Sequence, residues 1–137
     1  MTEITQIMSA SPVTVEPDDT LATVKEIFDQ LAFHHLPVVE DYRLVGLVSD
    51  RDLLKALSPH LGSAAETMRD LATLKKRVHQ VMNRNLVTLP ASAVLADAVR
   101  VFNLEGVSCI PVVDADRRPL GVLTWRDVMR ALDARPE

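Results

Sequence analysis

The chain has 137 residues, of which 47% are apolar and 25% are charged, as in one compact globular unit or two small lobes that share a core. The formal net charge of −4 argues against nucleic acid or an anionic membrane surface as the main partner. The single cysteine, Cys109, excludes an intrachain disulfide and is typical of a reducing compartment. The N-terminal residues lack the features of a signal peptide and no apolar run is long enough to cross a bilayer, so we expect a cytoplasmic protein.

The elements of the first half follow one another in a readable order. An apolar turn at Ile4–Met8 precedes a short strand at Val13–Val15 and a proline-containing turn, in which Asp18 is the expected N-cap of a helix. Two apolar strands, Leu36–Glu40 and Leu44–Ser49, come next, and a second helix ends the pattern. The first helix has apolar residues at helical spacing on one face, namely Leu21, Val24, Ile27, Phe28 and Leu31. The turn between the strands is expected at Asp41-Tyr42-Arg43.

Residues 58–77 form a separate segment. Ser63–Glu66 reads S-A-A-E, a capping box that predicts the start of a linker helix. The basic run Lys75–Arg77 suits the C-terminus of that helix, where cations oppose the helix dipole. A small basic contact patch is the alternative interpretation of this run.

The second half of the chain repeats the first. Ile4–Met8 aligns with Val78–Met82, and the matches continue through the glycines Gly46 and Gly121 into the last helices. The same elements therefore return: a strand at Val87–Leu89, Ser92 as N-cap, a helix, strands at Ile110–Asp114 and Leu120–Thr124, a turn at Ala115–Arg118 between them, and a final helix. We predict repeats at residues 1–57 and 78–137 with a linker at 58–77. Each β-α-β-β-α repeat is too small to bury both faces of its sheet, which predicts an α/β (α+β) fold with the two repeats packed sheet to sheet.

Each repeat places an S/T-x-x-D motif where its last strand runs into its last helix, at Ser49–Asp52 and at Thr124–Asp127. One interpretation is a capping box, in which the hydroxyl and the carboxylate bond the free backbone N–H groups of the helix start. The other is a nucleotide grip, because a helix N-terminus attracts phosphate, a hydroxyl can donate to phosphate, and a carboxylate can accept from ribose hydroxyls. Arg51 and Arg126, inside the two motifs, add a forked cation.

With these residues the chain resembles a tandem pair of cystathionine-β-synthase (CBS) domains, the Bateman module. The resemblance extends from about Ile4 to Leu132 and rests on MSASPVTV, HHLPVVE and GLVSDRDLLKAL in the first repeat and on MNRNLVTL, SCIPVVD and GVLTWRDVMRAL in the second. It implies repeats related by a pseudo-twofold axis, and a regulatory ligand of the class of AMP, ADP, ATP or S-adenosylmethionine, with no required cofactor. It further implies that the hydroxyl contacts phosphate, that the carboxylate holds the ribose, and that the adenine packs against the other repeat.

Carried over residue by residue, the resemblance implies two ligand clefts. One cleft pairs Ser49, Arg51 and Asp52 with Val87, Val107 and Ser108. The other cleft pairs Thr124, Arg126 and Asp127 with Val13, Phe33, His34 and His35. Ser49 stands where the family has Thr and keeps the hydroxyl, whereas Trp125 is bulky where Asp50 stands in the first repeat, and Leu86 matches Pro12.

The two histidines make the clefts unequal. Protonation of His34 or His35 near pH 6.5 would add positive charge to the Thr124 cleft, which predicts that polyphosphate nucleotides prefer this cleft and bind it better as the pH falls. In the alternative interpretation both histidines are strand residues held by backbone hydrogen bonds.

Most domains of this family are attached to an enzyme, channel or transporter, and the length of this chain predicts a stand-alone sensor that signals to a partner protein. The alternative is a structural adaptor without a ligand, in which both corners are only helix caps and exposed sheet edges bind a protein. We expect no catalysis, because no catalytic motif is present, and no metal site, because adjacent histidines on a strand point to opposite faces. The apolar residues of the linker helix, Met68, Leu71 and Leu74, predict a homodimer.

Overall fold

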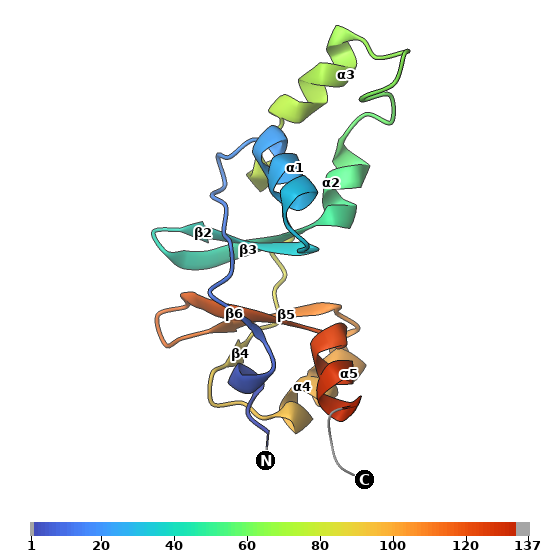
Figure 1. The fold of residues 1–137 in the computed structure, drawn as a ribbon. Coiled ribbons are helices and arrows are strands. Elements are labelled where there is room, and N and C mark those ends of the chain that lie inside the picture. Colours follow the sequence, from blue (N-terminus) through green and yellow to red (C-terminus); the bar gives the residue numbers. More distant parts are fainter. Residues whose placement is uncertain (1, 134–137) are drawn as a thin grey trace. The chain divides into compact units, whose positions relative to one another are not determined.

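The computed structural model describes residues 2–133. Over this range the chain divides into two compact units (Figure 1). The repeat-1 unit comprises Val13–Asp41 and Val45–Arg84. The repeat-2 unit comprises the residues up to Pro12, the short stretch Tyr42–Leu44, and the residues from Asn85 onward.

The repeat-1 unit is a two-stranded sheet covered by helices. The strands β2 (His35–Glu40) and β3 (Arg43–Ser49) pair with each other, and Val15 adds a parallel bridge to Val38. Helices α1 (Leu21–Gln30) and α2 (Asp50–Ala56) lie over the same face of this sheet (Figure 1). The short helix α3 (Met68–Ala72) and the 3₁₀ helices Thr73–Lys75 and Val78–Gln80 complete the unit.

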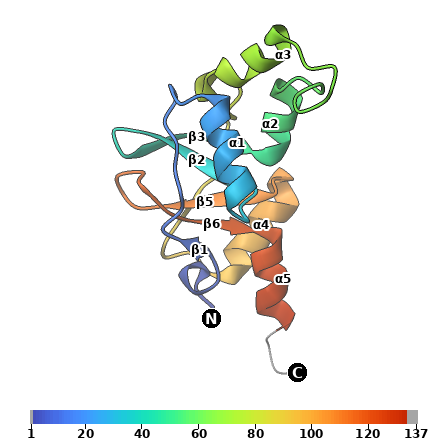
Figure 2. The same cartoon turned by 45° about the horizontal axis from the view of Figure 1, so that its top comes forward.

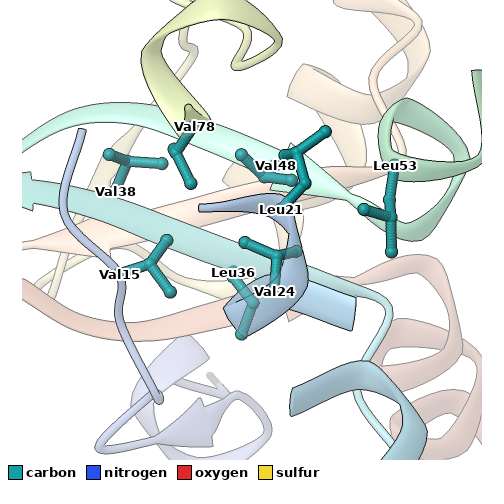
Figure 3. Close-up of a cluster of buried hydrophobic side chains, with 8 residues drawn as sticks. All are labelled: Val15, Leu21, Val24, Leu36, Val38, Val48, Leu53 and Val78. Carbon is teal, nitrogen blue, oxygen red and sulfur yellow. The ribbon is translucent and has the colours of Figure 1, made fainter. Parts of the chain in front are cut away.

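The core of the repeat-1 unit explains why these segments fold together. The apolar face predicted for the first helix buries Leu21 and Val24 completely, with Ile27 and Phe28 partly buried beside them. The alternating pattern of β3 directs Val48 toward the same core, where it meets the inward residues of β2. Eight buried side chains form the cluster drawn in Figure 3: Val15, Leu21, Val24, Leu36, Val38, Val48, Leu53 and Val78.

The repeat-2 unit has a four-stranded sheet in the order β1-β6-β5-β4. Its elements are the 3₁₀ helix Ile4–Gln6, β1 (Ser9–Ala10), β4 (Leu89–Pro90), α4 (Leu95–Glu105), β5 (Cys109–Val113), β6 (Pro119–Thr124) and α5 (Trp125–Asp133). Strand β6 runs antiparallel to β1 and β5, and β4 runs parallel to β5. Figure 2 shows β1 at the edge of this sheet and α4 beside α5. The buried core contains Ile4, Ala93, Ala98, Ile110, Val112 and Leu123.

The first turn of each repeat belongs to the unit of the other repeat. Ile4 is fully buried in the core of the repeat-2 unit, and its backbone N–H donates to the carbonyl of Ala93 at 3.1 Å. Val78, its counterpart, is fully buried in the core of the repeat-1 unit, and its N–H donates to the carbonyl of Asp19 at 2.9 Å. The sequence pattern did not reveal this exchange.

The mixed α/β fold of two repeats is confirmed. The predicted strands are present as β2, β3, β5 and β6, and the predicted turns connect them. Asp41 and Tyr42 both have positive φ (51° and 66°), which suits the tight turn between β2 and β3. Arg117 has a φ of 62° in the turn between β5 and β6.

The expected N-caps of the first helix in each repeat are wrong. Residues 16–19 close a turn of their own, since the N–H of Glu16 donates to Asp19 Oδ2 at 2.7 Å, so α1 begins later, with Thr20 as its N-cap. Likewise the N–H of Ala93 donates to the carbonyl of Pro90 at 3.0 Å, and α4 begins after Val94. The expected strands are shorter too: Val15 makes only a bridge, and β4 starts at Leu89.

The linker helix also begins later than predicted. The side chain of Ser63 donates to the carbonyl of His60 and that of Glu66 accepts from the N–H of Gly62, so the S-A-A-E segment closes a loop instead of starting a helix. The helix α3 starts after Thr67, whose hydroxyl and the carboxylate of Asp70 form the capping box. Of the basic run, Lys76 donates to the carbonyl of Ala56 at the end of α2, at 2.8 Å, which agrees with capping but at another helix.

Candidate functional site

The two S/T-x-x-D motifs occupy equivalent corners in the two units. In the repeat-1 unit β3 ends at Ser49 and α2 starts at Asp50. In the repeat-2 unit β6 ends at Thr124 and α5 starts at Trp125. The buried strand fixes the hydroxyl at the helix start, and the helical turn returns the carboxylate to it.

At the repeat-1 corner the capping box is complete. The N–H of Ser49 donates to Asp52 Oδ2 at 2.9 Å, and the N–H of Asp52 donates to Ser49 Oγ at 3.1 Å. The side chain of Arg51 between them is exposed. The corner therefore has the local geometry of a helix cap and also presents a cation to solvent.

A histidine joins this corner. His34 Nδ1 lies 2.9 Å from Asp50 Oδ2, and because a carboxylate only accepts, the histidine donates. The N–H of Asp50 in turn donates to the carbonyl of His34 at 3.0 Å. The sequence places these residues far apart, and only the pairing of β2 with β3 brings them together. Any positive charge on His34 is thus faced by a carboxylate of its own unit.

His35, the first residue of β2, is half-buried. Burial lowers the pKa of His35 below its usual value; the carboxylate of Asp50 opposes this effect, and the neighbouring His34 adds to it. The lowered pKa works against the expectation that His35 supplies positive charge near pH 6.5.

At the repeat-2 corner the carboxylate has more partners. Asp127 Oδ2 accepts from the N–H of Thr124 at 2.9 Å and from its hydroxyl at 3.1 Å. Asp127 Oδ1 accepts from Nη2 of Arg130 at 3.1 Å. The side chain of Asp127 is only 6% exposed, whereas that of Arg130 is 70% exposed. The spacing of Arg130, three residues after Asp127 on one helix, is the signal by which the sequence could have revealed this pair.

Cys109 lies opposite Thr124 in the β5–β6 ladder, which places Ser108 and Val107 at the repeat-2 corner of their own unit. Burial raises the pKa of the Cys109 thiol to about 12, and the charge of Asp127 adds to the effect. The thiol is therefore a protonated core group.

The remaining predicted site residues lie in the two units as follows. Val13 packs against the core of the repeat-1 unit and Val107 against the core of the repeat-2 unit. Phe33 is exposed just before β2, and Val87 is half-buried before β4. The pairing of each corner with residues of the other repeat stays a prediction.

Two shallow hollows lie within single units, and neither is lined by a corner residue. One, of about 360 Å³, is bounded by Leu89, Ser92, Asp97 and Arg100, and the other, of about 270 Å³, by Ala22, Glu26 and Leu74. Among residues 2–133 no group of three His, Cys, Asp or Glu side chains is arranged to hold a metal ion. None of the helices in this range is long and apolar enough to cross a membrane.

The sequence profile of the CBS domain matches the chain twice, at residues 4–59 and 78–134. The chain belongs to the CBS domain family. Both corners described above fall inside the two matched segments, and so do both exchanged turns.

Relatives of this CBS-domain protein include short and long chains. A CBS domain-containing protein of Dictyostelium discoideum is 32% identical over 131 residues, which cover 94% of this chain and 90% of the relative. L-aspartate semialdehyde sulfurtransferase of Methanocaldococcus jannaschii is 26% identical over 95% of this chain, but the match spans only 23% of that enzyme.

Solved CBS-domain structures share the fold over almost the full length. The CBS domain pair of protein MJ0100, solved in complex with 5′-methylthioadenosine and S-adenosyl-L-methionine, has a TM-score of 0.80, with 26% identity and 99% of both chains covered. CBSX2, solved in complex with AMP, has a TM-score of 0.77, with 28% identity and 96% of both chains covered. CBSX2 is a CBS-pair protein of Arabidopsis thaliana.

Proposed function

We propose that this CBS-domain protein is a regulatory module that binds adenosine-containing ligands at its two corners and signals their level to a partner protein. One observation carries the proposal. Hydroxyl, cation and carboxylate stand together at the strand-to-helix corner of both units, in a chain whose structural relatives were solved with AMP and with adenosyl ligands. No catalytic role is part of the proposal.

The capping bonds at the corners do not prevent ribose binding. A carboxylate offers about four acceptor positions, and at the repeat-1 corner the N–H of Ser49 takes one of those on Asp52. The remaining positions can accept from the two vicinal hydroxyls of a ribose. The hydroxyl of Ser49 and the exposed fork of Arg51 can donate to phosphate, since both carry N–H or O–H groups beside the helix start.

The proposed ligand set follows the resemblance in each repeat. Asp52 and Asp127 hold ribose, and Ser49, Thr124, Arg51 and Arg126 face phosphate. The adenine contacts residues of the first expected strand of a repeat or at the entrance to its second, namely Val13, Phe33, His34, His35, Val87, Val107 and Ser108. The ligand acts as a regulator and not as a required cofactor.

The test compares ligand-induced thermal shifts with AMP, ADP, ATP and S-adenosylmethionine. A ligand at about 100 times its dissociation constant adds about 2.7 kcal/mol to the free energy of unfolding. Asp52→Ala and Asp127→Ala should each remove the part of the ligand-induced thermal shift that comes from one corner. Asp97→Ala is the matched control, because Asp97 Oδ2 caps α4 through the N–H of Val94 at 2.9 Å, yet lies at neither corner.

The control separates the two hypotheses. If Asp52→Ala and Asp127→Ala lower the unfolding temperature as Asp97→Ala does but leave the ligand shift intact, the carboxylates are only caps. If no ligand shifts the parent protein, the adaptor function is favoured, and the complete capping box at Ser49 is the observation that supports it.

We also propose a homodimer. The support is apolar surface on and after α3: Met68 is 81% exposed, Leu71 is exposed, and Leu74 is half-buried. Light scattering at micromolar concentration should give twice the mass of the chain, and Met68→Glu with Leu71→Lys should lower it. A monomeric mass for the parent contradicts this proposal.

A further inference from the structure

The carboxylate of Asp127 is engaged on both oxygens within its own unit. Thr124 takes Oδ2 through its backbone N–H and its hydroxyl, and Arg130 takes Oδ1 through Nη2. Nε of Arg130 also points at the carbonyl of Arg126, 3.5 Å away, which keeps the guanidinium over the corner. Three of the about four acceptor positions of Asp127 are therefore taken, so a ribose that bonds Asp127 through both vicinal hydroxyls must take the place of one of these partners.

Arg130 is the partner that can leave. The N–H of Thr124 belongs to the end of β6, where the strand fixes it next to the buried carboxylate. The side chain of Arg130 is long and flexible and is 70% exposed. When Arg130 leaves, its guanidinium returns to solvent and Asp127 keeps both bonds from Thr124, so the Arg130–Asp127 contact is the cheaper one to break.

We propose that Arg130 is a specificity-determining residue of the Thr124 corner, an inference that rests on the proposed function. A ribose displaces the guanidinium from Asp127, and a phosphate on the same ligand gives the guanidinium a new anionic partner. An uncharged nucleoside breaks the ion pair without replacing it. The Thr124 corner therefore selects adenosine phosphates over adenosine.

The repeat-1 corner lacks an equivalent ion pair. Lys55 occupies the position of Arg130 in the first repeat, and the ion pairs among residues 2–133 include none between Lys55 and Asp52. A lysine is a point charge on a flexible stem and does not offer the planar fork that matches a carboxylate. The Ser49 corner therefore accepts charged and uncharged adenosine ligands more evenly.

The experiment measures AMP and adenosine affinities by calorimetry on the full chain carrying Asp52→Ala, which removes the ribose site of the other corner. In this background AMP should bind more tightly than adenosine. Arg130→Gln should strengthen adenosine binding by about two- to fivefold, the equivalent of one exposed ion pair, and should weaken AMP binding. Arg130→Lys, which keeps the charge without the planar fork, should give AMP and adenosine affinities between those of the Asp52→Ala background and those of Arg130→Gln.

Lys55→Gln in the same background is the control, since it removes one cation without touching Asp127. It should leave the ratio of AMP to adenosine affinity unchanged. Thermal unfolding without ligand checks that each variant is folded.

The possible results separate this inference from the proposed function. If AMP binds but Arg130→Gln leaves adenosine binding unchanged or weaker, the role of Arg130 is overturned and the proposed function stands. If the Asp52→Ala chain binds neither ligand, recovery of adenosine binding in Arg130→Gln supports the inference, and no recovery overturns it. If neither ligand binds the parent or any variant, the proposed function fails and this inference fails with it.

Discussion

Met82 packs its thioether directly on Gly46, with Sδ 2.6 Å from the point that a Cβ on Gly46 would occupy. Met8 stands in the same relation to Gly121, also with Sδ at 2.6 Å. Each methionine ends one of the exchanged turns, and each glycine lies in the last strand of the unit that receives the turn. Each glycine, by having no side chain, therefore leaves the space in which the methionine of an exchanged turn packs; we call Gly46 and Gly121 the seats of the exchanged turns.

A side chain at either seat should destabilise the protein, and the two seats should differ. The three atoms nearest to an added Cβ on Gly46 all belong to the side chain of Met82, which can move, so Gly46→Ala should cost about 1 kcal/mol. An alanine at Gly121 also meets the backbone carbonyl of Ser9 at 2.7 Å, so Gly121→Ala should cost about 3 kcal/mol. Urea unfolding of the two variants measures this difference, and equal costs would contradict it.

The start of α3 can be tested by removing hydroxyls. Thr67→Ala removes the N-cap and should cost about 1 kcal/mol of stability. Ser63→Ala changes only a loop and should cost less than about 0.5 kcal/mol. Chemical unfolding of both variants distinguishes the two helix starts, because a larger loss in Ser63→Ala would place the cap at the earlier position.

Cys109 should be unreactive in the folded protein. Its side chain is buried and its pKa is raised to about 12, so almost no thiolate forms at pH 8. A colorimetric thiol reagent should label the native chain very slowly and the chain in denaturant completely. The raised pKa also favours the folded state below the pKa of the unfolded thiol, a contribution that is lost as the pH rises toward 12. Cys109→Ala should therefore lose less stability than the parent between pH 8 and pH 10.5.

His35 should make the stability of the protein depend on pH in the acidic range. Because burial lowers its pKa in the folded state, the unfolded chain takes up the proton first as the pH falls below about 6.5. The parent should lose stability between pH 8 and pH 5, and His35→Gln should lose less. Thermal unfolding at several pH values measures this, with His60→Gln as the control for the loss of an imidazole elsewhere. Identical pH profiles for the parent and His35→Gln would contradict the role of burial.

The repeat and the elements that form its sheets could be predicted because they depend on local periodicity. Apolar spacing over Leu21–Leu31 and the strand pair around Asp41 each describe a segment that has one face to bury. Helix starts were less accessible, because several S/T-x-x-D/E patterns compete. Thr67–Asp70 carries the same signature as Ser63–Glu66, and only the closed loop at Gly62 decides between them.

The candidate site shows the same division. The capping geometry at Ser49–Asp52 follows from the motif alone. The contact of His34 with Asp50 depends on which strands pair, so local sequence could not reveal it. The exchanged turns were hidden for another reason: Ile4–Met8 and Val78–Met82 are near copies, and two interchangeable segments cannot indicate which seat each one fills.

The exchange decides what happens when the chain is severed between its halves. A piece that ends before Val78 keeps the turn around Ile4, whose seat at Gly121 is on the other piece, and loses the turn that covers its own Gly46. Each piece then carries the turn that the other piece needs and lacks the turn that packs on its own glycine. The two pieces should reassemble by complementation in trans, each donating its turn to the other. The covalent linker would then serve to keep each turn at high local concentration near its glycine.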